Sequence, residues 1–106
     1  MHNPQSFYLE YLDNLGRCHL CNQERNLTFH HLIPRKVHAR NFFKKMYSKK
    51  ELNLGINVCR LCHSGIHKLY SEEYLAKELN TIDKLKSDQN VIKHCNWSAK
   101  QKTKGK

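Results

Sequence analysis

Residues 59–67 read Cys59-Arg60-Leu61-Cys62-His63-Ser64-Gly65-Ile66-His67, so metal-ligating side chains fill four of these nine positions. The two cysteines have the CxxC spacing that presents two thiolates to one ion. The two histidines are four residues apart, and on a helix their imidazoles would share one face. At about 3.6 residues per turn, that face lies roughly a quarter-turn from the cysteines. One short helix can therefore serve two metal ions.

A second CxxC pair precedes this stretch, and together the two pairs make a four-thiolate set. Zinc in structural sites takes four ligands in a tetrahedron, and each CxxC turn supplies two. We therefore expect a structural Zn²⁺ bound by Cys18, Cys21, Cys59 and Cys62. Residues 22–58 are longer than the usual insert of a zinc ribbon, so they must loop out. A redox role for one pair would leave the other pair unexplained, and Cys95 has no place in either pattern.

The same stretch also matches the CxxCH pattern by which haem is covalently attached. That attachment normally requires export, and residues 1–11 lack the basic region and apolar run of a signal peptide. The haem interpretation also gives Cys18 and Cys21 no role. We therefore favour zinc and expect a cytoplasmic protein, because a reducing compartment keeps paired thiols available for metal. No stretch is long enough to predict a membrane span.

A pair of adjacent histidines, His30 and His31, lies between the two cysteine pairs. The run Leu27–Ile33 is rich in β-formers and is closed by Pro34, which predicts a strand. Successive side chains of a regular strand point to opposite faces, so both histidines reach one site only if the strand end is twisted or bent. Pro34 is a reason for such irregular pairing. Alternatively, only one histidine belongs to the site.

The chain is strongly basic, with 19 lysines and arginines against 9 acidic residues and a net charge of +10. A polyanion is the natural partner, although charge alone also serves solubility. Anionic membrane is a weaker interpretation, because no basic amphipathic helix with an aromatic-rich face is evident. Nucleic acids are contacted chiefly through phosphates, and a basic segment with aromatic anchors spans residues 35–50. Its expected nucleic-acid contacts, each of which could also be a solvated surface residue, are Arg35, Lys36, His38 and Arg40.

The 106 residues are enough for one domain with a modest core, which makes a metal staple useful. We expect an α+β fold over residues 1–99, with a core at about 17–70, a helical extension at about 71–99 and a disordered basic tail at 100–106. A packing helix is predicted over Ser6–Leu15 and a short strand over Ile56–Val58. Further helices are predicted from their capping residues, which are Ser48 with Glu51, Ser71 and Thr81.

Taken together, these motifs resemble the small zinc-containing branch of the HNH endonucleases. The branch pattern is CxxC, HHLIPR, an asparagine and CxxCHxxxH, and this chain reads CHLC, LTFHHLIPR, ELN and CRLCHSGIH. The match runs from Arg17 to about His67, and the later NTIDKL and Trp97 also resemble the tail of this branch.

The resemblance implies a ββα-metal unit, in which a two-stranded hairpin and a helix grip one divalent ion to hydrolyse DNA. It implies that His30, His63 and His67 are the metal ligands and that His31 is the general base. The central asparagine, which orients the base, best matches Asn53, although Asn57 is also close to the second cysteine pair.

These expectations leave choices open. A histidine-only site has fewer oxygen ligands than Mg²⁺ prefers, so Mn²⁺, Co²⁺ or Ni²⁺ should support cutting at least as well as Mg²⁺. Cutting both strands together would need a homodimer, and neither the DNA structure that is cut nor the exclusion of RNA follows from the residues. The rival interpretations are a zinc-ribbon module that binds nucleic acid without cutting it and a zinc-dependent protein-interaction adaptor.

Overall fold

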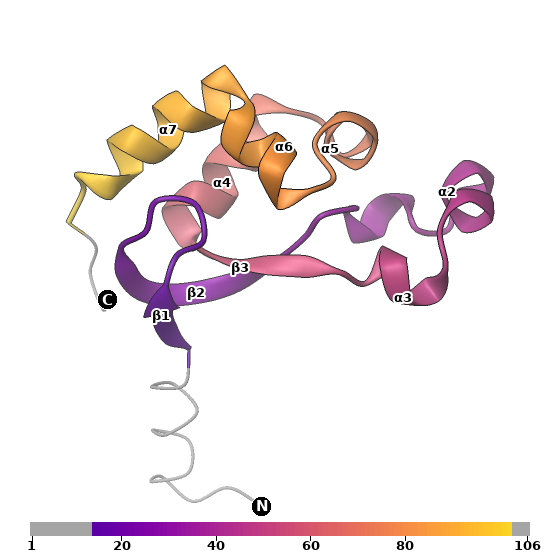
Figure 1. The fold of residues 1–106 in the computed structure, drawn as a ribbon, viewed down its shortest axis with the longest axis horizontal. Helices are drawn as coiled ribbons and strands as arrows, with labels where there is room; N and C mark the ends of the chain where they lie inside the picture. Colours follow the sequence, from indigo (N-terminus) through magenta and orange to yellow (C-terminus); the bar gives the residue numbers. More distant parts are fainter. Residues whose placement is uncertain (1–13, 103–106) are drawn as a thin grey trace, which may run out of the picture.

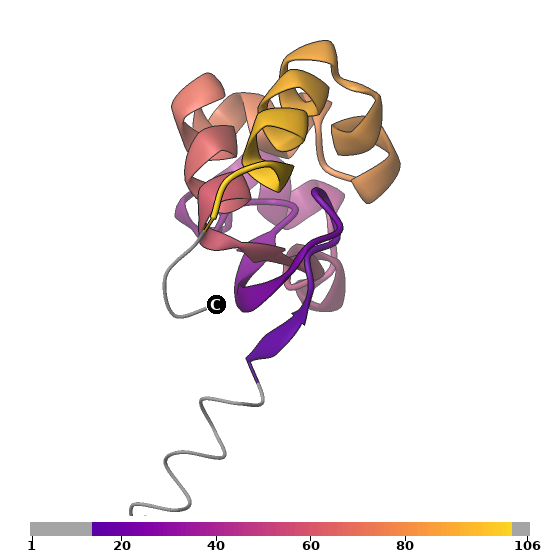
Figure 2. The same ribbon diagram turned by 90° about the vertical axis from the view of Figure 1, so that its left-hand side faces the viewer.

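The structure, a computed structural model, describes residues 14–102 and has a mixed α/β architecture. Its sheet is antiparallel and three-stranded, in the order β1 (Leu15–Arg17), β2 (Glu24–His31) and β3 (Gly55–Cys59). The helices within residues 60–99 gather on one side of this sheet, as Figures 1 and 2 show from two directions, and the short helices between β2 and β3 lie beyond one end of it (Figure 1). The expected combination of a small sheet with packing helices is therefore confirmed.

The central strand β2 determines which residues of the two cysteine and histidine motifs meet. It pairs with β3 from Leu27 opposite Cys59 to His31 opposite Gly55. Its start pairs with β1, where Leu15 lies opposite Asn26. The expected strand over Leu27–Ile33 thus begins earlier and ends at His31, because the chain turns at Pro34 into a 3₁₀ helix, η1 (Arg35–Val37). The predicted strand Ile56–Val58 lies within β3.

The helix predicted over Ser6–Leu15 falls mostly outside the described residues. Its last residue differs from expectation, because Leu15 is in β1 and not in a helix. The antiparallel pairing with β2 fixes the extended conformation here, and the preceding Asn14 carbonyl accepts a hydrogen bond from the Leu27 amide at 2.8 Å. Gly16 is paired with Arg25 in the sheet.

Helix α4 (Arg60–Leu69) begins directly after β3 and packs against β2 and β3. Helix α7 (Gln89–Ala99) lies alongside α4, and α5 (Glu72–Glu78) and α6 (Ile82–Ser87) complete the same layer (Figure 1). Two short helices, α2 (Asn41–Met46) and α3 (Lys49–Leu52), connect η1 to β3.

Side-chain caps fix where several helices begin, as the sequence predicted. Ser48 and Glu51 form a capping box at α3, with bonds of 3.1 and 2.8 Å. Ser71 and Thr81 each accept a backbone hydrogen bond at the start of α5 and α6. Asp88 caps α7 in the same way. These bonds satisfy backbone donors that have no partner inside the helix.

The core is divided into two clusters, which suits a short chain with little apolar surface to bury. The larger one joins the sheet to α4 and α7 and includes all five cysteines. The smaller one surrounds Phe43 of α2 and consists of Ile33, Val37, Phe43, Leu52 and Ala76. Within residues 14–102, no helix has the length and apolarity needed to cross a membrane.

Candidate functional site

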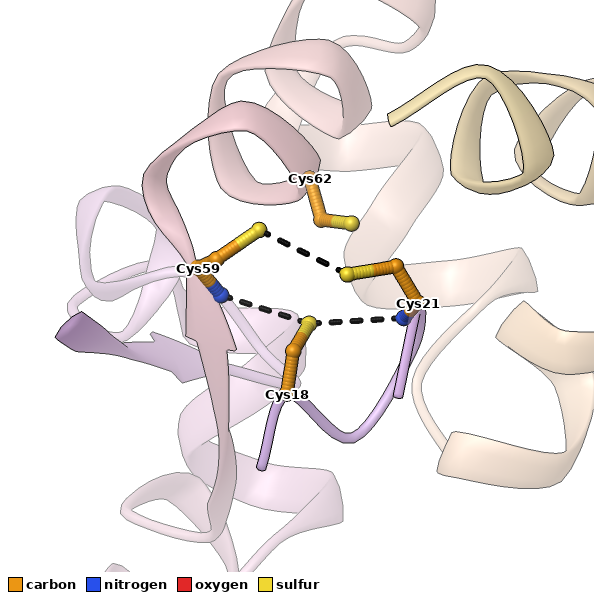
Figure 3. Close-up of side chains that lie close together, drawn as sticks. All are labelled: Cys18, Cys21, Cys59 and Cys62. Atoms are coloured by element: carbon orange, nitrogen blue, oxygen red, sulfur yellow. Dashed lines mark hydrogen bonds between the residues drawn. The ribbon is translucent and has the colours of Figure 1, made fainter. Parts of the chain in front are cut away.

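Four buried cysteines meet where the turn after β1 approaches the start of α4 (Figure 3). The sulfur atoms of Cys18, Cys21, Cys59 and Cys62 all lie within 4.8 Å of one another. The Sγ atoms of Cys21 and Cys59 are 3.8 Å apart. A tetrahedral site with Zn–S bonds of about 2.3 Å has sulfur–sulfur edges of about 3.8 Å. The expected cysteine set is therefore brought together with the dimensions of a structural metal site such as zinc.

Backbone amides converge on the first sulfur of this cluster. Cys18 Sγ accepts hydrogen bonds from the amides of Leu20 and Cys21 at 3.4 Å and from that of Cys59 at 3.3 Å. Hydrogen bonds with Cys18 and Cys62 lower the pKa of the Cys59 thiol, whereas hydrogen bonds with Cys18 and Cys59 raise the pKa of the Cys62 thiol. A divalent ion would displace the thiol protons, because the thiolate is the form that binds metal.

A buried arginine that the sequence interpretation missed contacts the cysteine cluster. Arg25, only 5% exposed, lies with Nη1 3.6 Å from Cys21 Sγ and 3.5 Å from Cys59 Sγ. Its Nη2 donates to the carbonyl oxygens of Ser98 at 2.9 Å and Gln101 at 2.6 Å. A buried cation requires negative charge nearby, and four thiolates around a divalent ion supply it. The contact with Gln101 also extends packed structure past the expected boundary at residue 99.

Three histidines form a second cluster between β2 and α4. Ligand nitrogens of His30, His63 and His67 lie within 4.8 Å of one another. A point among three such atoms can be within about 2.8 Å of each, so modest side-chain adjustment reaches the usual 2.0–2.1 Å of a Zn–N bond. The cluster was predicted from the HxxxH spacing and the preceding strand.

The most buried of these imidazoles lacks any hydrogen-bond partner among the described residues. His30 is 1% exposed, and both of its ring nitrogens are buried without a partner. Burial, followed by the charges of His63, His67 and His31, lowers the pKa of His30 to about 3. The ring is therefore neutral, which is the form that binds metal. Unpartnered buried nitrogens are expensive, and a bound ion would satisfy one of them.

His31 is not part of the three-histidine cluster but lines an open cleft of about 250 Å³ beside it. The rings of Phe29 and His38 flank it, with centroids 4.9 and 5.6 Å away. Burial, then the charges of His38 and Arg35, lower the pKa of His31. The cleft lining includes both ligand histidines of α4 and consists of Phe29, His31, Pro34, Arg35, Lys36, His63, His67 and Glu72.

The adjacent residues His30 and His31 thus approach the same site from two directions. His30 meets α4, and His31, the last residue of β2, opens into the cleft that His63 and His67 also line. This is the outcome that strand alternation permits at the end of a strand, where the partner residue is Gly55 and adds no side chain. Both histidines can therefore belong to the same site.

The four predicted nucleic-acid contacts divide into two groups. Arg35 and Lys36 are exposed and line the cleft. His38 instead donates from Nε2 to the Ile33 carbonyl at 2.6 Å, which holds the turn after β2. Arg40 lies outside the cleft lining and pairs with Glu73 at 3.4 Å.

Neither candidate for the central asparagine lines the cleft. The Asn53 amide donates to the Lys49 carbonyl at 3.0 Å, at the end of α3. The backbone of Asn57 pairs with His19, whose amide donates to the Asn57 carbonyl at 3.0 Å. Two cleft residues were not foreseen, Phe29 and Glu72, and the Glu72 carboxylate lies 3.9 Å from His67 Nδ1. The alternation of strand β2 places Phe29 beside His31 and was the one available signal.

The fold and its two clusters define the class: a small mixed α/β protein with a buried four-cysteine cluster suited to a structural metal ion and a three-histidine cluster beside a cleft. The chain belongs to the family of the uncharacterized protein YisB of Bacillus subtilis (strain 168), to which it is 32% identical over 87 residues. That alignment covers 81% of this chain and 76% of YisB. No protein-family profile and no solved structure matches the chain.

Proposed function

We propose that this protein is a metal-dependent HNH endonuclease that hydrolyses phosphodiester bonds in DNA. The succession of β2, β3 and α4 supports a ββα-metal unit, because two antiparallel strands lead directly into a helix, and β2 and α4 supply the histidine cluster. The buried cysteines would hold a structural Zn²⁺ at the start of the same helix. The basic excess of the chain fits a polyanionic substrate.

The observation that carries the proposal is the environment of His30. Both of its nitrogens are buried without a hydrogen-bond partner among residues 14–102, and one of them lies within 4.8 Å of ligand nitrogens of His63 and His67. A purely structural histidine at this depth would normally have a hydrogen-bond partner. A divalent cation such as Mn²⁺, Mg²⁺, Co²⁺ or Ni²⁺ fits a set of three imidazole nitrogens beside the cleft.

The side chains around the cleft divide the remaining work. When bound, the ion would stabilise charge on the phosphate and on the departing oxygen. His31 is neutral near pH 7 because its pKa is lowered, so its ring can take a proton from an attacking water in the cleft. Arg35 and Lys36 at the rim can contact phosphates beside the one that is cut. The flanking rings of Phe29 and His38 restrict the orientation of the His31 side chain. For Asn53, only its position in the sequence supports the expected role of orienting the base.

Plasmid nicking by zinc-loaded protein with added Mn²⁺ tests the proposal. We expect His31→Ala to lower the rate by about 10²–10⁴-fold, the usual effect of losing a general base, while zinc content and DNA binding stay at the wild-type level. Cys59→Ser is the folding control and should lose zinc and structure together. If His31→Ala nicks as fast as the wild type, the assigned base is wrong. If the wild type binds DNA and never cuts it, the non-catalytic zinc-ribbon module is the better assignment.

A further inference from the structure

The hydroxyl of Thr28 stands behind one ligand of the histidine cluster. Thr28 Oγ1 lies 2.9 Å from His63 Nδ1 and 3.0 Å from the Val58 carbonyl oxygen. Thr28 is two residues before His30 in β2, so both side chains leave the same face of the strand, toward α4. Val58 is its register partner in β3, so the sheet itself fixes the position of the hydroxyl.

The two contacts together determine where the hydrogens lie. A threonine hydroxyl has one proton, and a carbonyl oxygen can only accept. Thr28 therefore donates its proton to Val58 and can only accept at the other contact. His63 Nδ1 must then be the donor and must carry a hydrogen. Nε2 is then the ring nitrogen that is left to bind a metal ion.

We propose that Thr28 is a positioning residue that holds His63 in the Nδ1–H tautomer, so that Nε2 is presented to the divalent ion. This inference rests on the proposed histidine metal site. Of the three ligand histidines, His63 has its tautomer set by a direct hydrogen bond. Within the part of the chain that the structure describes, His30 has no hydrogen-bond partner, and Glu72 is 3.9 Å from His67, beyond hydrogen-bond length. His63 is thus the ligand whose orientation is settled before any ion arrives.

A matched pair of variants separates the hydroxyl from the shape of the side chain. Thr28→Val keeps the branched shape and removes the hydroxyl, and valine is at least as favourable in a strand. Thr28→Ser keeps the hydroxyl and loses the methyl group. Both should fold as the wild type does, which circular dichroism and zinc content will check before any metal measurement.

Binding of Ni²⁺ to protein already loaded with one equivalent of Zn²⁺, measured by calorimetry, reads out the effect without any cleavage. Loss of a partner that orients a metal-binding histidine typically lowers affinity by about 10–100-fold. We expect that loss in Thr28→Val and near wild-type affinity in Thr28→Ser. Equal Ni²⁺ affinity in Thr28→Val and wild type would overturn the proposal, as would an equal loss in both variants.

Imidazole nitrogen shifts from ¹⁵N NMR report the tautomer of His63 directly in the protein with Zn²⁺ alone. The wild type and Thr28→Ser should have the hydrogen on Nδ1, and Thr28→Val should give a mixture. A wild-type His63 with its hydrogen on Nε2 would overturn the assignment. A protein that shows the expected tautomer and Ni²⁺ affinities but cuts no DNA would refute the nuclease and leave the role of Thr28 standing.

Discussion

Arg25 Nη1 lies 3.5 Å from Cys59 Sγ, so a strand residue places a positive charge beside a cluster whose members come from two distant CxxC turns. The same guanidinium reaches the end of α7 through Ser98 and Gln101. The charge of the cysteine cluster and the packing of the last helix therefore depend on one side chain.

Replacing Arg25 with leucine should weaken both zinc binding and folding. Removing one partner of a buried charge pair destabilises by about 3–5 kcal/mol, since the remaining charge is left uncompensated. Arg25→Lys keeps the charge and loses the fork that bonds α7, so it should fall between leucine and wild type. Zinc release to a chelator and urea unfolding measure the two effects. Wild-type zinc retention in Arg25→Leu would contradict this account.

Gly65 allows α4 and α7 to approach closely. A side-chain carbon at this position would collide with the His94 ring, which donates to the Leu61 carbonyl at 2.8 Å. We expect Gly65→Ala to destabilise the fold by about 1–3 kcal/mol, the usual effect of overpacking. In a His94→Ala background the collision is gone, so the added methyl group should be tolerated. Urea unfolding of the two single variants and the double variant gives the coupling energy, and strict additivity would exclude the collision.

Acid should reduce stability through His30. Its folded pKa of about 3 is below its ordinary 6.5, so between these values the unfolded chain binds a proton that the folded chain does not. The stability contribution is complete above pH 6.5 and is lost as pH falls toward 3. From pH 7 to 5 the loss from this group is about 2 kcal/mol.

His30→Gln is the control for the acid effect, because glutamine does not titrate. Urea unfolding of zinc-loaded wild type and variant at pH 7 and pH 5 should give a larger drop for the wild type. Acid release of zinc affects both proteins alike. Equal drops would mean that His30 takes up its proton in the folded state near the ordinary pKa.

Arg35 and Arg40 make a matched pair for DNA binding. Arg35 lines the cleft, whereas Arg40 is paired with Glu73 outside it. Each lost phosphate contact lowers the slope of log affinity against log salt by about 1. We expect this change in Arg35→Ala, and in Lys36→Ala for the same reason, but not in Arg40→Ala. Fluorescence anisotropy at several salt concentrations measures the slopes; the same slope for Arg35→Ala and wild type would remove Arg35 from the interface.

The choice of metal gives a further prediction. Three imidazole ligands suit Mn²⁺, Co²⁺ and Ni²⁺ at least as well as Mg²⁺, which prefers oxygen. Plasmid nicking by zinc-loaded protein should therefore be at least as fast with any of these three ions. Cutting supported by Mg²⁺ alone would contradict a histidine-only ligand set.

Spacing along the chain predicted the four-cysteine set and the shared face of His63 and His67, whereas the resemblance to the HNH branch implied that His30 is the third ligand. A CxxC turn and an HxxxH helix fix local geometry within a few residues, and the four cysteines and three histidines do come together. The caps at Ser48, Ser71 and Thr81 were predictable for the same reason, because each bonds only a few residues along the chain.

Residues whose roles depend on distant partners were not predictable. Arg25 is a strand residue in a basic chain, and only the packing of α7 reveals that it is buried. His38 stays a predicted phosphate contact, and its hydrogen bond to the Ile33 carbonyl, five residues back, follows from the turn at Pro34 and was not predicted. Leu15 ends a sequence pattern that predicts a helix, but it is paired with Asn26 in the sheet, and this later strand partner determines its conformation.

Cys62 and His63 are neighbours in the first turns of α4, so both metal centres share one rigid element. An apo cysteine cluster would release the N-terminal end of this helix, from which His63 and His67 project toward β2. The zinc occupancy of a preparation should therefore set the upper limit on the fraction of molecules that can bind a second ion. Specific activity would then scale with zinc content even when zinc is not the ion that supports cutting.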